Sequence, residues 1–68
     1  MSIINTSVRY RMRATGVGNF CLEVGCIGGD FAPIRYGSME ELMPRLERLA
    51  AETLCRVYVA DNGEAVVL

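Results

Sequence analysis

The segment Ser38–Glu52 constrains the fold of this chain more than any other stretch. Apolar residues recur at positions 39, 42, 43, 46, 49 and 50, the spacing of one face of an α-helix, and charged residues fill the opposite face. Ser38 followed by Glu41 is typical of a capping box: the serine oxygen accepts from a backbone N–H and the glutamate reaches back to the cap. We therefore predict one amphipathic helix. It should continue through Pro44 but kink there, because the proline ring meets the carbonyl of Glu40.

Segments on both sides of this helix alternate between apolar and polar residues, as half-buried strands do. They are Thr6–Arg13, Phe20–Ile27, Phe31–Tyr36, Leu54–Asp61 and Glu64–Leu68. The sequence therefore predicts a single α+β domain over residues 1–68 with the order β-β-β-α-β-β. One amphipathic helix should pack on one face of a mainly antiparallel sheet of four to five strands. The strand order stays open, although a final hairpin beside the first strand would keep the hairpins together.

Turn residues predict how neighbouring strands pair. A three-residue loop at 28–30 places Ile27 opposite Phe31, Leu22 opposite Tyr36 on the inward face, and Glu23 opposite Arg35 on the outer face. A two-residue turn would instead place the inward-facing Leu22 opposite Arg35, so we favour the longer loop. Pro33 lacks a backbone donor, which predicts an edge strand. Asn62-Gly63 predicts a type I′ hairpin turn.

Several residue types that carry chemistry are missing or badly spaced. The chain has no histidine, the commonest general base and metal ligand. Of its three cysteines, Cys26 and Cys55 are expected in the core and Cys21 at the surface, a spacing that does not suit zinc. The glycine-bearing turns join strand to strand, so they do not form a phosphate loop. We therefore expect no enzyme activity, no catalytic residue, no metal and no cofactor.

Composition predicts the setting of the protein. The odd number of cysteines indicates a reducing compartment, and residues 1–6 lack the pattern of a signal peptide. No apolar run has the length of a membrane span, so we expect a cytoplasmic protein without membrane contacts. The formal net charge of −1 provides no overall attraction to nucleic acid, and all seven basic residues are arginine.

The sheet face away from the helix is the candidate binding site. We expect it to carry Arg9, Arg11, Arg13, Glu23, Arg35, Arg56 and Tyr58, flanked by Ile27 and Phe31. Simple cross-strand charge pairing would explain these residues at tenths of a kcal/mol per pair. Arginine and tyrosine are also enriched at protein interfaces, which favours a protein partner with an acidic patch.

Three other modes of association stay open. The same face could bind nucleic acid, or it could form a homodimer. The terminal strand 64–68 could also extend a partner's sheet if it lies at an edge.

The layout from Val8 to Leu68 is similar to that of very small phage proteins that disable host machinery, including anti-CRISPR proteins and RNA-polymerase inhibitors. They share a few strands, a capped helix such as Ser38-Met39-Glu40-Glu41-Leu42, and a closing hairpin like Val57–Val67. The resemblance implies an inhibitor that occludes a protein surface. Several such inhibitors are strongly acidic, whereas this chain is nearly neutral, which disfavours mimicry of DNA.

Overall fold

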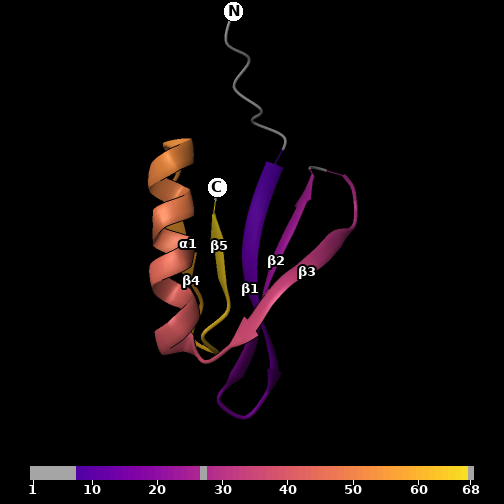
Figure 1. Ribbon diagram of the computed structural model, residues 1–68, viewed down its shortest axis with the longest axis vertical. Coiled ribbons are helices and arrows are strands. Elements are labelled where there is room, and N and C mark those ends of the chain that lie inside the picture. The colour runs from indigo at the N-terminus through magenta and orange to yellow at the C-terminus, as the bar shows by residue number, and fades with distance from the viewer. Residues whose placement is uncertain (1–7, 27, 68) are drawn as a thin grey trace, which may run out of the picture.

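The computed structural model describes residues 8–26 and 28–67 (Figure 1). The element order is β-β-β-α-β-β, with one helix packed against one sheet, so the predicted α+β class is confirmed. The elements are β1 (Val8–Gly16), β2 (Asn19–Cys26), β3 (Phe31–Gly37), α1 (Met39–Thr53), β4 (Val57–Val59) and β5 (Ala65–Val67). Thr6, Ser7, Ile27 and Leu68, which we predicted to lie in strands, are outside the described residues.

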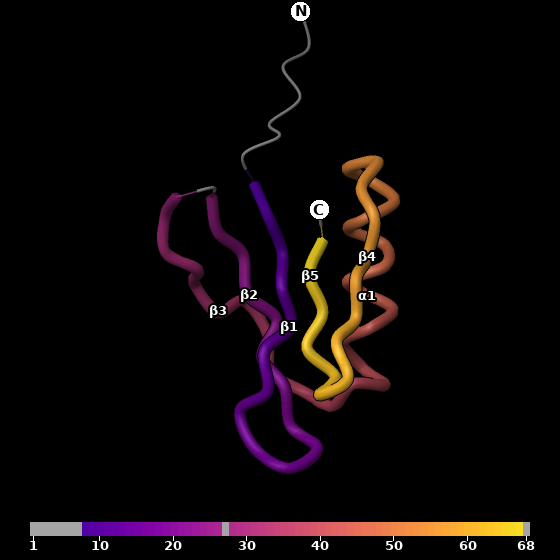
Figure 2. The backbone as a smooth tube through the Cα atoms, turned by 180° about the vertical axis from the view of Figure 1, so that it is seen from behind, coloured from indigo at the N-terminus to yellow at the C-terminus, as the bar shows by residue number. Residues whose placement is uncertain are grey.

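The sheet has five antiparallel strands in the order β3-β2-β1-β5-β4, which can be followed from left to right in Figure 2. The strand order, which the sequence left open, thus places the final hairpin beside β1 and keeps the hairpins together. The strand β5 lies between β1 and β4, so the terminal strand is not an edge and cannot extend a partner's sheet. The edge strands are β3, as Pro33 indicated, and β4.

The helix α1 begins where the capping pattern placed it. Ser38 has extended backbone angles, and its Oγ accepts a hydrogen bond from the Glu41 N–H at 3.4 Å. Leu42, Leu46 and Ala50 are buried on the face that meets the sheet. The helix runs continuously through Pro44, as predicted, whereas the kink at this residue stays a prediction.

The core forms between the apolar stripe of α1 and the inward face of the sheet. Its buried residues are Met12, Phe20, Leu22, Leu42, Leu46, Ala50, Ala65 and Val67. Gly63 closes one end of this core, where its φ of 87° favours glycine. A Cβ added at Gly63 would also lie 2.5 Å from Met39 Cε and 3.0 Å from Phe20 Cζ, so a larger residue would displace these side chains in addition to straining the backbone.

The Gly63 turn differs from the predicted type I′ hairpin. Among the described residues of this turn only Gly63 has positive φ, whereas a type I′ turn requires it at Asn62 too. Ala60 donates its N–H to the Glu64 carbonyl at 2.7 Å across a three-residue loop, and Asn62 Oδ1 accepts from the Glu64 N–H at 3.0 Å. The strand β4 is shorter than the predicted 54–61, because the turn takes its end and Leu54 caps α1 in the left-handed conformation at its beginning.

The pairing of β2 with β3 also differs from the predicted register. Glu23 lies opposite Pro33 and Leu22 lies opposite Arg35, so a bulge leaves Ile34 without a partner. Because Pro33 cannot donate a hydrogen bond, the regular ladder is easily interrupted at this point. The extra residue reverses the alternation, and Arg35 takes the helix side of the sheet. At the hairpin end Phe31 lies opposite Gly25 instead of the predicted Ile27, so Glu23 meets Pro33 and its predicted pairing with Arg35 is wrong.

Two cysteine assignments are also wrong. Cys21, expected at the surface, is fully buried, and Cys26, expected in the core, is exposed. Cys21 lies between Arg13 and Tyr36 in a cross-strand row, where long neighbouring side chains cover it. Cys26 ends β2 away from the core. Cys55 is partly buried and packs against the core, as expected.

Candidate interaction surface

The candidate surface is the sheet face opposite α1, and we call it the open face. Its residues are arranged in cross-strand rows. The central row crosses all five strands and contains Tyr58, Val66, Arg11, Glu23 and Pro33. The flanking rows are Arg9, Gly25 and Phe31 on one side and Arg13, Cys21 and Tyr36 on the other.

Glu23 is the centre of the open face. Its side chain is only 6% exposed, which is unusual for a carboxylate unless it is paired. Arg11 Nε donates to Glu23 Oε1 at 2.8 Å. Arg13 donates from Nε to Oε1 at 3.3 Å and from Nη2 to Oε2 at 3.5 Å. One buried carboxylate therefore holds two arginines from the adjacent strand in fixed positions.

The ionisation of Glu23 reflects two opposing effects. Burial favours the neutral carboxyl group and so raises its pKa. The hydrogen bonds and positive charges of Arg11 and Arg13 outweigh burial, and the pKa of Glu23 lies below its ordinary value. The hydrogen bond to Glu23 in turn raises the pKa of Arg13. Glu23 and Arg13 therefore face each other as opposite charges at neutral pH.

Phe31 gives Arg11 a second support. The Arg11 guanidinium carbon lies 4.1 Å from the centre of the Phe31 ring, a cation–π contact. The ring fits there because Gly25 lies beneath it. A Cβ at Gly25 would be 2.9 Å from Phe31 Cγ and 2.9 Å from the Asp30 carbonyl oxygen. Arg11 is thus held between a carboxylate and an aromatic ring.

Exposed tyrosines lie on both sides of this cluster. Tyr36 is 64% exposed and Tyr58 is 53% exposed. The neighbouring Cys21 thiol raises the pKa of the Tyr36 phenol, mainly by hydrogen bonding, so Tyr36 remains a neutral donor and acceptor. The open face combines positive charge with aromatic area, and no described segment covers it.

The structure unites most of the predicted site. Arg9, Arg11, Arg13, Glu23 and Tyr58 share the open face, as expected. Arg56 is exposed and lies directly before β4. Arg35 does not belong to this face, because the bulge at Ile34 turns it to the helix side.

Sequence reasoning missed Tyr36, which it paired with Leu22 on the inward face. Only the position of the bulge decides where this residue points. Pro33, a residue typical of bulges, was the available signal.

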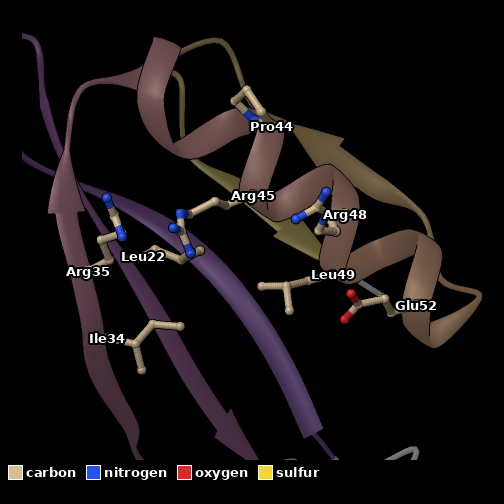
Figure 3. A pocket seen from close by; sticks show the side chains of 8 residues that line it. All are labelled: Leu22, Ile34, Arg35, Pro44, Arg45, Arg48, Leu49 and Glu52. Carbon is tan, nitrogen blue, oxygen red and sulfur yellow. The ribbon is translucent and has the colours of Figure 1, made fainter.

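A concave site lies on the other side of the sheet. A pocket of about 610 Å³ opens between β2, β3 and α1 (Figure 3). It is lined by Leu22, Ile34, Arg35, Pro44, Arg45, Arg48, Leu49 and Glu52. None of the helix residues among them was expected to form a site.

Comparison of this chain with protein-family models, with curated proteins and with solved structures finds no match. Within residues 8–26 and 28–67 no helix has the length and apolar character needed to cross a membrane. The same residues contain no cluster of three or more side chains suited to holding a metal ion.

Proposed function

We propose that this protein is a non-enzymatic binding module whose open face docks onto an acidic patch of a protein partner. One observation carries the proposal: a buried carboxylate fixes two arginines on a sheet face that also exposes two tyrosines. Arginine and tyrosine dominate the energetics of protein interfaces, especially when their positions are fixed before binding. Arg9, Arg11 and Arg13 against Glu23 leave a net positive face, which complements a negative surface.

Occlusion of the partner surface is the proposed mode of action. The open face needs no chemistry to block a surface, and the layout resembles small phage inhibitors such as anti-CRISPR proteins. The proposal includes a cytoplasmic location, which follows from the odd cysteine count and a reducing compartment.

The structure also decides how the face should be tested. Reversing the charge of Arg11 would place two carboxylates side by side at a buried position and would damage the fold. Arg9→Glu combined with Tyr58→Ala changes two residues of the same face that form no ion pair within the described chain. Arg45→Glu on α1 is the matched control, since it reverses one charge on the opposite side.

The experiment uses the full chain as bait in a host lysate, followed by measurement of affinity for the captured protein. We expect the Arg9→Glu/Tyr58→Ala variant to lose the partner and Arg45→Glu to retain it. Retention by a folded double variant would refute the role of the open face.

Two other outcomes would support the alternative functions. DNA binding with an affinity that falls by about one log unit per log salt for each phosphate contact would indicate a nucleic-acid-binding domain. A mass and thermal stability that depend on concentration would indicate a homodimer.

A further inference from the structure

The pocket between β3 and α1 has a feature that docking through the open face does not use. Arg35 from β3 and Arg45 and Arg48 from α1 all line it (Figure 3). Figure 3 shows Arg35 and Arg45 extending from facing elements into the space between them. The pocket therefore gathers three of the seven arginines of the chain at one concave site.

These arginines lack the internal partners that the open-face arginines have. Among the described residues, the ion pairs within 4.0 Å are those of Glu23 with Arg11 and Arg13. Arg35, Arg45 and Arg48 make no such pair there. Like charges gathered at one site repel one another, and Glu52, the one carboxylate among the described lining residues, forms no ion pair with them, so a bound anion would relieve that repulsion.

The β3 bulge is what places Arg35 in this pocket. In an uninterrupted strand, Arg35 would share the open face with Pro33. The extra residue Ile34 turns Arg35 toward Leu22 and α1, and Ile34 itself lines the pocket. Bulges often re-aim a side chain next to a binding site.

The remaining lining gives the pocket an apolar wall. Leu22 is 1% exposed and forms part of the core, while Ile34, Pro44 and Leu49 add further apolar surface. Glu52 lies one helical turn beyond Arg48, at the end of the pocket away from Arg35 (Figure 3). The site therefore has a cationic end, an apolar middle and one acceptor at the far end.

We propose that this pocket binds an organic phosphate of mononucleotide size. Arginine forks match phosphate oxygens in paired hydrogen bonds, and a phosphate monoester carries enough charge to engage more than one guanidinium. The apolar wall suits a flat base, whose amino group can donate to Glu52. A volume of about 610 Å³ lies within the usual size range of small-molecule pockets.

The test is titration of the full chain with adenosine monophosphate, adenosine and inorganic phosphate, followed by calorimetry and by the NMR signals of the arginine side chains. We expect adenosine monophosphate to bind more tightly than either fragment and to shift the signals of Arg35 and Arg45. Arg35→Gln and Arg45→Gln should each weaken binding about ten- to hundredfold, because each removes a charge-assisted hydrogen bond.

Two matched variants keep the test specific. Arg56→Gln removes an exposed arginine outside the pocket and should leave the affinity unchanged. Ile34→Ala shortens the apolar wall and should lower the affinity for adenosine monophosphate more than the affinity for phosphate. Three results would overturn the proposal: no binding of adenosine monophosphate, phosphate binding as tight as that of the nucleotide, or an equal loss in Arg56→Gln. None of these outcomes bears on the open face.

Discussion

The two arginine-bearing regions of this small protein differ in how their charges are balanced. On the open face, Arg11 and Arg13 share a buried glutamate, and Arg11 also stacks on Phe31. In the pocket, Arg35, Arg45 and Arg48 have no carboxylate within ion-pair distance among the described residues. On the open face, the folded chain itself balances the arginine charges. In the pocket, the proposed bound anion would balance them. The same residue type therefore supports stability in one region and offers binding capacity in the other.

The largest effect that separates the two regions should come from their carboxylates. Glu23→Gln removes the shared partner of two arginines at a buried position, and we expect it to lower the free energy of unfolding by about 2 kcal/mol. Glu52→Gln removes an exposed carboxylate without an ion pair within the described chain, and should change stability by less than about 0.5 kcal/mol. Urea denaturation of both variants measures the difference. Equal losses would show that the two regions are not distinct.

Acid should remove the stabilisation that the ionised Glu23 gives to the open face. The folded-state pKa of Glu23 is lowered, so its contribution to stability is fully present above the pKa of the unfolded chain. That contribution is lost as the pH falls through the lowered folded-state value. The stability gap between wild type and Glu23→Gln should therefore narrow below about pH 4, near the ordinary glutamate pKa. Denaturation at a series of pH values tests this, and a gap independent of pH would contradict the pairing.

The support of Arg11 by Phe31 gives a third test. In Gly25→Ala the new Cβ would meet the Phe31 ring and the Asp30 carbonyl oxygen, so we expect a loss of about 1–2 kcal/mol and displacement of the ring. Gly29→Ala is the matched control, because its Cβ would be 3.6 Å from the nearest atom and its φ is not positive. Thermal unfolding reports stability, and NMR of the Phe31 ring reports its position. A stable Gly25→Ala protein with an unmoved ring would refute the close packing.

The smallest effect concerns single arginines. Arg13→Gln should cost about 0.5–1 kcal/mol, since the partner is buried but Arg13 is half exposed. Arg45→Gln should be neutral or slightly stabilising, because it reduces repulsion in the pocket. The comparison is made by denaturation in phosphate-free buffer at low salt. A clear loss in Arg45→Gln would reveal an internal partner and weaken the case for an external anion.

The amino-acid sequence predicts the elements of this fold better than the pairing between them. The helix, its Ser38 cap and the alternation of β1 depend on local spacing, so they could be recognised directly. The register of β3 could not be recognised in this way. We excluded a pairing of Leu22 with Arg35 because an arginine is not expected opposite an inward-facing leucine. In the structure this pair lies at the pocket, where a long arginine can cover apolar surface and still reach solvent.

The residues of the candidate site were also predicted well on regular strands and badly after the bulge. Arg9, Arg11, Arg13 and Glu23 lie on regular strand segments, and period-two alternation places them correctly. Arg35 and Tyr36 follow an irregularity whose position the pattern does not reveal, and both were assigned to the wrong face. Cys21 shows in addition that burial depends on the length of neighbouring side chains as well as on the face a residue occupies.

The bulge at Ile34 has a consequence for how proteins of this shape could diverge. Deletion of Ile34 would leave Arg35 opposite Leu22 and Tyr36 opposite Cys21 in a regular ladder, so both surfaces would keep their residues. If Ile34 were kept and the bulge closed, Arg35 and Tyr36 would exchange faces without either being substituted. A substitution of Pro33 that restores a regular ladder would therefore trade an arginine for a tyrosine at both sites in a single event.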